Sequence, residues 1–247
     1  MTPTDRLPLL RVEPSKIASH VLVVGDPMRA KRAAENLDDV ELVGDNREYS
    51  TFTGRLGETR MTVASHGVGS AGAGVCFEEL IRAGAKVVIR AGTCGSLCDS
   101  ISDGDMIVVT GAVRDEGLTP RLVPLSYPAL AHYDLVATLL EVAHGTGQNV
   151  HHGLMLSSDL FYPSQALGQD FSLWQRSRVI GVEMELAALF VLASLHGIRA
   201  GGIAVVDGNP TRAAQDMSEY DPYRRVVRDA TDVMIRVALE ALARVET

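Results

Sequence analysis

Residues 61–96 carry the pattern that most restricts the fold. An apolar run at the start of this stretch ends in the glycine-rich segment 66–72, and a helical stripe of apolar side chains follows. A second apolar run at 86–89 leads into Arg90 and a predicted glycine turn at 92–95. Strand, helix and strand in this order form a βαβ unit, so we expect a sheet that is at least partly parallel.

The same stretch contains a motif with competing interpretations. Gly67-x-Gly69-x-x-Gly72 matches the dinucleotide fingerprint, which also requires an acid about 20 residues further on, at the tip of the second strand. Arg90 stands at that tip instead. An arginine beside a glycine and threonine loop suits phosphate or another small anion better than a ribose. A tight turn that uses glycine for packing alone is the third interpretation.

Size and composition limit the class of protein. The chain has 247 residues, of which 46% are hydrophobic, enough for one large α/β domain spanning residues 1–247. It contains no apolar run of membrane-spanning length, and its first residues lack the pattern of a signal peptide. Three cysteines at irregular spacing indicate a reducing cytoplasm. A net charge of −8 without a basic cluster argues against nucleic acid as a partner.

The first predicted strand, at 21–24, ends in a second candidate anion site. Asp26 can cap the following helix and Pro27 suits its first position. The N–H of Gly25, the helix N-terminus and Arg29 would together favour an anion. The alternative is a surface arginine on a well-capped helix.

The remaining periodicity predicts a single domain with a central mixed, partly parallel twisted sheet flanked by helices. Further strands are expected at 40–43, 52–56, 60–64, 106–110, 151–157 and 202–206, and helices at 28–37, 135–143, 186–195 and 222–244. The segment 180–185 is expected to open the helix at 186–195, and 211–220 to form a loop. We find no repeats and no low-complexity linker.

Polar and aromatic residues near the predicted element ends suggest a site for a nucleoside. Glu185, before a buried helix, could accept hydrogen bonds from a vicinal diol such as that of ribose. Asp207 ends an apolar strand, where desolvation would raise its pKa and make it an acid near neutral pH. Phe161 and Tyr162 could supply a flat face for a heterocycle. The plainer alternatives are solvated helix-start acids, including Glu183, a packing loop and an ordinary turn.

Other catalytic signatures are missing from the sequence. The pairs His151-His152 and Cys94/Cys98 do not supply the four ligands of a zinc site. Neither a GxSxG motif nor a P-loop is present. We therefore expect no metal and no cofactor.

Six spaced motifs follow one another between residues 20 and 245. They are Val23-Val24-Gly25-Asp26-Pro27-x-Arg29, Asn46-Arg47-Glu48-Tyr49, Ser65-His66-Gly67-Val68-Gly69, Arg90-Ala91-Gly92-Thr93-Cys94-Gly95, Ser157-Ser158-Asp159-x-Phe161-Tyr162-Pro163 and Val182-Glu183-Met184-Glu185. Together they resemble the hexameric nucleoside phosphorylases, the family of purine nucleoside and uridine phosphorylases. In such enzymes of nucleoside salvage, phosphate attacks C1′ opposite the base, and the base and ribose 1-phosphate leave.

This resemblance implies a role for each matching residue. Phosphate would be held by Gly25, Arg29, Arg90 and Thr93, with Arg47 from a neighbouring subunit. Ribose would be held by Met184 and Glu185, and the base would lie against Cys94, Gly95, Phe161, Gln165, Val182 and Glu183. Because Arg47 would come from a second chain, the resemblance implies a homo-oligomer, a hexamer built as a trimer of dimers. Its substrates would be a nucleoside and phosphate, with no nucleic acid and no membrane as partners.

The preferred base depends on single residues. The purine branch of the family protonates N7 of the base with an Asp at the end of a late strand, which Asp207 resembles. The uridine branch uses a Gln and, two positions on, an Arg; here Gln165 is present but Leu167 stands where that Arg would be. Losing a charged partner for a buried carbonyl weakens recognition of uracil. We therefore expect a purine nucleoside phosphorylase, with uridine phosphorylase as the alternative.

Two departures from the family pattern affect the expected substrate and mechanism. Leu9 stands where the family usually places a His that reaches the neighbour's ribose 5′-hydroxyl, so 5′-deoxy or 5′-methylthio nucleosides are expected to be accepted. The family's purine branch usually also has an Arg after the Asp that assists proton transfer. Arg212 and Arg224 are the candidates, although neither has the expected spacing.

Three other functions stay open at this point. A nucleosidase on the same fold would use water in place of phosphate. A NADP-linked oxidoreductase would use the glycine motif, with Arg90 on the 2′-phosphate, but it leaves Arg29, Glu185 and Asp207 without a role. A nucleoside-binding protein without catalysis would bind the ligand and release no base.

Overall fold

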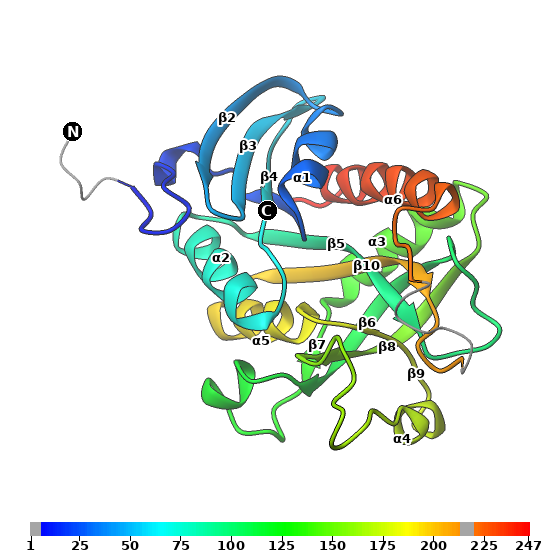
Figure 1. The fold of residues 1–247 in the computed structure, drawn as a ribbon. Helices are drawn as coiled ribbons and strands as arrows, with labels where there is room; N and C mark the ends of the chain where they lie inside the picture. Colours follow the sequence, from blue (N-terminus) through cyan, green and yellow to red (C-terminus); the bar gives the residue numbers. More distant parts are fainter. Residues whose placement is uncertain (1–5, 213–219) are drawn as a thin grey trace.

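The computed structural model describes residues 6–212 and 220–247 (Figure 1). Ten strands of this part of the chain form one sheet. They are β1 (His20–Val24), β2 (Asp38–Asn46), β3 (Tyr49–Leu56), β4 (Thr59–Ser65), β5 (Val87–Ser96), β6 (Met106–Asp115), β7 (Ala129–Leu130), β8 (Val150–Ser158), β9 (Val179–Glu183) and β10 (Arg199–Gly208). The helices are α1 (Pro27–Ala34), α2 (Ser70–Arg82), α3 (Tyr133–His144), α4 (Ser172–Arg176), α5 (Leu186–His196) and α6 (Arg225–Ala243), with short 3₁₀ turns at Pro14–Lys16 and Thr119–Arg121.

The sheet is mixed, and half of it closes on itself. β5 pairs in parallel with β1 and β10 and antiparallel with β9. The pairs β10–β6, β6–β8 and β8–β9 complete a ring of five strands, whereas β1, β4, β3 and β2 continue from it as an open arm. This arrangement confirms the prediction of a mixed, partly parallel sheet.

Helices cover both faces of the sheet. α2 and α5 pack together in one apolar cluster, and α1, α3 and α6 contribute to a second cluster across the sheet (Figure 1). α5 is the most apolar helix, and its residues from Leu186 to Ala193 are all buried. None of the described helices combines the length and the apolar character that crossing a membrane requires.

The predicted turn at 92–95 is wrong, because β5 continues through it to Ser96. Arg90 therefore lies inside the strand, opposite Val23 of β1 and Gly202 of β10. A Cβ atom at Gly92 would lie 2.3 Å from Nη1 of Arg90. Glycine is needed here because the arginine side chain lies across the strand, and not because the backbone turns.

Two further boundaries differ from the prediction. The segment 180–185 does not open a helix as expected. Residues 179–183 form β9 instead, and buried and half-buried residues alternate along it. The last helix begins at Arg225, because the carboxylate of Asp221 accepts a hydrogen bond from the N–H of Tyr223 in a local turn (2.8 Å). Most of the predicted loop at 211–220, namely residues 213–219, lies outside the described residues.

Candidate active site

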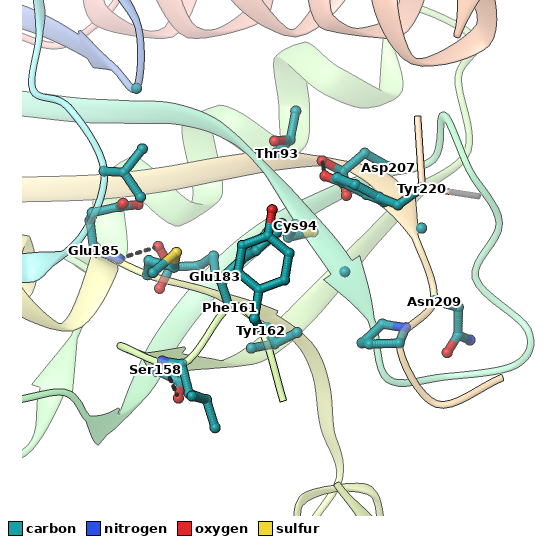
Figure 2. Close-up of a pocket in the computed structure, with 18 of the residues that line it drawn as sticks. Thr93, Cys94, Ser158, Phe161, Tyr162, Glu183, Glu185, Asp207, Asn209 and Tyr220 are labelled. Carbon is teal, nitrogen blue, oxygen red and sulfur yellow. Dashed lines mark hydrogen bonds between the residues drawn. The ribbon is translucent and has the colours of Figure 1, made fainter. Parts of the chain in front are cut away.

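A cavity of about 520 Å³ opens where several strands of the ring end (Figure 2). It collects side chains from segments that are far apart in the sequence. Its lining comprises Gly25, Arg29, Gly67, Val68, Arg90, Thr93, Cys94, Gly95, Ser158, Leu160, Phe161, Tyr162, Gln169, Phe171, Val182, Glu183, Met184, Glu185, Asp207, Gly208, Asn209, Pro210 and Tyr220. The cavity has the position expected for a ligand of a parallel sheet, and its volume suits a small molecule.

One end of the cavity is formed by the start of α1. Gly25 follows β1, and Asp26 caps the helix by accepting a hydrogen bond from the N–H of Arg29 (2.8 Å). Nε of Arg29 also lies 3.4 Å from Oδ2 of Asp26. The cap fixes the first turn of α1, and with it the cation at the edge of the cavity.

Arg90 is the second cation and is almost fully buried. Its Nη2 donates to Oε2 of Glu185, and its Nη1 lies 3.4 Å from Oε2 of Glu183. Nε and Nη1 have no hydrogen-bond partner among the described residues. A buried guanidinium with unused donors, at a cavity that also holds Arg29, is a strong site for an anion.

The two glutamates next to Arg90 have different environments. Burial raises the pKa of Glu183. Burial acts in the same direction on Glu185, but the Arg90 guanidinium leads the interactions that outweigh it and hold its pKa below the ordinary value. Glu185 is therefore a carboxylate at neutral pH, able to accept hydrogen bonds from a diol.

Glu183 fixes the turn from β9 into α5. One of its carboxylate oxygens accepts hydrogen bonds from the N–H groups of Glu185 (2.7 Å) and Leu186 (2.9 Å), and the other accepts from the hydroxyl of Ser157. That hydroxyl in turn accepts from the N–H of Ala187 (2.9 Å). Glu183 lines the cavity, but its carboxylate is already occupied by groups that position Glu185.

The glycine motif 67–72 also positions Glu185. Gly67 and Gly69 have φ values of 74° and 90°, which only glycine adopts readily. The N–H of Gly69 donates to Oε1 of Glu185 (2.7 Å), and the hydroxyl of Ser70 donates to the carbonyl of Met184 (2.7 Å). The motif thus binds the protein's own segment Met184-Glu185, which removes the main support for a dinucleotide site.

Asp207 lies at a bulge in β10. The register between β10 and β5 shifts between Val206 and Gly208, which gives Asp207 a direction different from that of a regular strand residue. Its carboxyl group is buried, accepts a hydrogen bond from the hydroxyl of Tyr220 (2.8 Å), and lies near the hydroxyl of Thr93. Burial raises its pKa above the ordinary value, and the two hydroxyls and Arg29 only partly offset this effect. The sequence-based expectation of a poorly solvated acid agrees with this geometry.

The far end of the cavity is aromatic. The rings of Phe161 and Tyr162 meet edge to face at 5.1 Å, and the rings of Phe161 and Tyr220 meet similarly at 5.9 Å (Figure 2). Cys94, Gly95 and Val182, expected at the base, also line the cavity. An apolar slot of this kind accommodates a flat heterocycle.

Three residues singled out in the sequence lie away from the cavity. Gln165 is exposed, because Ser164 and Gly168 form a bridge that turns 165–167 outward, and Gln169 lines the cavity in its place. Arg47 is exposed in the turn between β2 and β3 with a φ of 58°. Leu9 is held by a hydrogen bond from its N–H to Glu79 (2.9 Å).

Sequence reasoning missed several lining residues. They are Val68, Ser158, Leu160, Gln169, Phe171, Gly208, Asn209, Pro210 and Tyr220. Val68, Ser158 and Leu160 lie within the motifs at 65–69 and 157–163, so the motif residues beside them could have identified them as lining residues. No sequence signal marked Tyr220, because it follows Asp207 by 13 positions and no periodic pattern connects the two residues.

Comparisons with known proteins agree with this geometry. The sequence model of the phosphorylase superfamily matches residues 19–243. The chain is 36% identical over 236 residues to the guanosine phosphorylase of Halorubrum lacusprofundi, covering 95% of this chain and 97% of that one. It is 35% identical over 237 residues to the uridine phosphorylase of Treponema pallidum, with 92% and 90% covered.

A solved structure extends the likeness to three dimensions. The crystal structure of purine nucleoside phosphorylase from Toxoplasma gondii in complex with immucillin-H matches with a TM-score of 0.92 and 30% identity, over 98% of this chain and 97% of that chain. Likeness of this extent covers the sheet, the helices and the segments that line the cavity. The chain therefore belongs to the phosphorylase superfamily and, within it, to the nucleoside phosphorylases.

Proposed function

We propose that this chain catalyses the reversible phosphorolysis of purine ribonucleosides and deoxyribonucleosides to the free base and (deoxy)ribose 1-phosphate. The observation that carries the proposal is one cavity with two cations at one end and a buried carboxyl group of raised pKa, Asp207, beside the aromatic end. The cations suit phosphate, and the acid suits a leaving base that must gain a proton.

The reaction is derived from these positions. Arg29 and Arg90, with Gly25 and Thr93, bind inorganic phosphate, and Glu185 orients the ribose by accepting hydrogen bonds from its hydroxyls. The C1′–N9 bond breaks as positive charge develops on the sugar, which phosphate oxygen then attacks at C1′. Electrons from the broken bond pass to the base, and the proton of the Asp207 carboxyl group neutralises them at N7. Phosphate is a co-substrate in this scheme, and no cofactor is required.

A purine is favoured over uracil because of Asp207. Identity with relatives does not separate the two, since the guanosine and uridine phosphorylases match almost equally well. A purine carries N7 as a site for the proton, whereas uracil has no equivalent ring nitrogen. Leu167, where the family's uridine branch has an Arg, is 91% exposed and adds no charged group to the cavity.

The proposal includes an oligomer with shared sites. Arg47 does not line the cavity of its own chain, and we propose that it reaches the phosphate of a neighbouring chain in a hexamer built as a trimer of dimers. We also propose that the whole chain acts as one domain in the cytoplasm. The odd number of cysteines at irregular spacing supports this compartment.

The 5′ end of the nucleoside is the least restricted part of the proposed substrate. Leu9 is apolar, and its backbone is fixed to Glu79, so it offers no hydrogen bond to a 5′-hydroxyl of a neighbouring site. We propose that 5′-deoxy and 5′-methylthio nucleosides are accepted. A kcat/KM for inosine equal to or above that of its 5′-deoxy analogue would rule out a preference for such nucleosides, and no turnover of the analogue would contradict their acceptance.

A substrate panel tests the proposal. Inosine, adenosine, uridine and methylthioadenosine are each incubated with and without phosphate, and base release is followed by ultraviolet absorbance. Phosphate-dependent release from the purine nucleosides supports the proposal. Faster release from uridine would assign the chain to uridine phosphorylase, and release without phosphate would make it a nucleosidase.

A further inference from the structure

Asp207 is held from both ends by the segment that follows residue 219. The hydroxyl of Tyr220 donates to Oδ2 of Asp207 (2.8 Å), and Nη2 of Arg224 donates to its main-chain carbonyl (2.8 Å). Nη1 of Arg224 also pairs with Asp103 (2.8 Å). Figure 2 shows Tyr220 directly beside Asp207 at the edge of the cavity. The carboxyl group and its backbone are thus fixed by two different side chains.

Neither candidate arginine contacts the carboxyl group of Asp207 in the described structure. Arg224 is engaged with the carbonyl and with Asp103, and Arg212 donates to the carbonyl of Asp99 (3.4 Å). The hydrogen-bond donor that an arginine was expected to supply is a phenol here. Unlike arginine, this donor is neutral, so it supports the acid without adding a permanent charge next to the base.

Tyr220 also contacts the aromatic end of the cavity. Its ring lies 5.9 Å from that of Phe161, with an interplanar angle of 67°. Besides Arg224, the other titratable or charged groups near Asp207 are Arg29 of α1, Asp103 of the segment before β6, and Cys94 of β5. Tyr220 therefore joins two parts of the cavity: its ring contacts Phe161 at the aromatic end, and its hydroxyl contacts the carboxyl group of Asp207.

We propose that Tyr220 is the positioning residue of the general acid: its hydroxyl holds Oδ2 of Asp207, so that the carboxyl proton is directed at the leaving purine. The inference rests on the proposed function. Before transfer, the Tyr220 hydroxyl donates to Oδ2 and the proton resides on the other carboxyl oxygen. As the C1′–N9 bond breaks, this proton moves to N7 and its bonding electrons stay on Asp207. Tyr220 keeps its own proton throughout and stabilises the carboxylate that forms.

The test uses two nucleosides that differ in their need for a proton. Inosine must be protonated at N7, whereas 7-methylguanosine already carries a positive charge on its base and leaves without a proton. In Tyr220→Phe we expect kcat for phosphorolysis of inosine to fall about tenfold, the worth of one hydrogen bond to a charged group. The kcat for 7-methylguanosine should change less than about twofold. A purely structural role of the ring would lower both rates together.

The pH profile supplies a second readout. A donor at Oδ2 favours the ionised form of Asp207, so its removal raises the pKa of that group. The alkaline limb of kcat for inosine should move upward by about one pH unit in Tyr220→Phe. Tyr223→Phe is the matched control, because Tyr223 is 85% exposed in the same segment, and this variant should behave as the wild type.

The outcomes separate this inference from the proposed function. Selective loss on inosine with a shifted alkaline limb supports the role of Tyr220. Equal loss on both nucleosides, or an unchanged rate and profile for inosine, overturns it while leaving phosphorolysis intact. If the wild-type chain releases no base from either nucleoside in the presence of phosphate, the proposed function itself fails.

Discussion

The two ends of the cavity are built in different ways. At the end proposed for phosphate and ribose, Arg90, Glu183 and Glu185 are at most 4% exposed and linked through strands and helix starts. At the end proposed for the base, Phe161 and Tyr162 are 44% and 68% exposed and stand on a loop. Regular elements fix a side chain more precisely than a loop does. On the proposed function, the rigid end therefore holds phosphate and ribose, the adaptable end contacts the base, and Asp207 lies between them.

The largest effect is expected at the rigid end. Arg90→Ala removes the partner of two buried glutamates, which should lower stability by about 3–5 kcal/mol. In protein that still folds, kcat/KM for phosphate should fall about 10³-fold, because the unused guanidinium donors are lost. Thermal unfolding and initial rates at varied phosphate concentration measure the two effects. Arg82→Ala, which removes an exposed arginine of α2, is the control. Similar phosphate kinetics in both variants would remove Arg90 from the anion site.

The next effect is expected where the two ends meet. Asp207→Asn keeps the shape of the side chain but cannot donate a carboxyl proton, so kcat for inosine should fall about 10²-fold or more. Steady-state rates at saturating phosphate measure this change. The exposed Asp229→Asn serves as the matched control. An unchanged rate in Asp207→Asn would show that another group supplies the proton.

The pH dependence of the wild type follows from the environment of the same group. Burial raises the pKa of Asp207, and the carboxyl group donates only while protonated. The kcat for inosine should therefore be maintained at lower pH and fall as the pH rises through the raised pKa. A profile measured in wild type and in Asp207→Asn tests this assignment. If the alkaline limb persists unchanged in the variant, it belongs to another group.

A smaller effect is expected at the adaptable end. Phe161→Ala removes a face of the base slot, so KM for inosine should rise about tenfold while kcat changes less. Because the ring is half exposed, the melting temperature should change little. A large loss of kcat with an unchanged KM would mean that Phe161 acts on the reaction and not on base binding.

The smallest effect is expected just outside the cavity. Gln165→Ala and Leu167→Ala change exposed side chains in the turn between Ser164 and Gly168, and each should alter kcat/KM for inosine and for uridine less than about twofold. Gln169→Ala, at a lining position, should change base preference more. A selective loss of uridine activity in Gln165→Ala would show that this turn closes over the base.

The sequence predicts the residues at the rigid end of the cavity better than those at the adaptable end. Arg29, Arg90, Glu185 and Asp207 stand at or near the ends of apolar runs, so local patterning was enough to suggest a common site. The sequence does not predict that β5 continues through 92–95. A glycine that makes room for the side chain of Arg90 cannot be told from a glycine that forms a turn by sequence alone. Such ambiguity is resolved only by the neighbouring strands.

The residues that the sequence did not predict depend on long-range placement. Tyr220 and Gln169 line the cavity from outside the helices and strands, where no periodic pattern marks a side chain as facing a site. β9 was mistaken for the start of a helix because its five residues are too short to show a clear period. Shared sites such as that proposed for Arg47 require a second chain, which the pattern of one chain does not describe.

The central claim is that phosphate attacks a purine nucleoside in this cavity. The most direct measurement is ³¹P nuclear magnetic resonance of the protein with inosine and inorganic phosphate. The account predicts that the inorganic phosphate signal is replaced by that of ribose 1-phosphate, in step with the hypoxanthine released. Hypoxanthine release with an unchanged phosphate signal would contradict it, because water would then be the nucleophile.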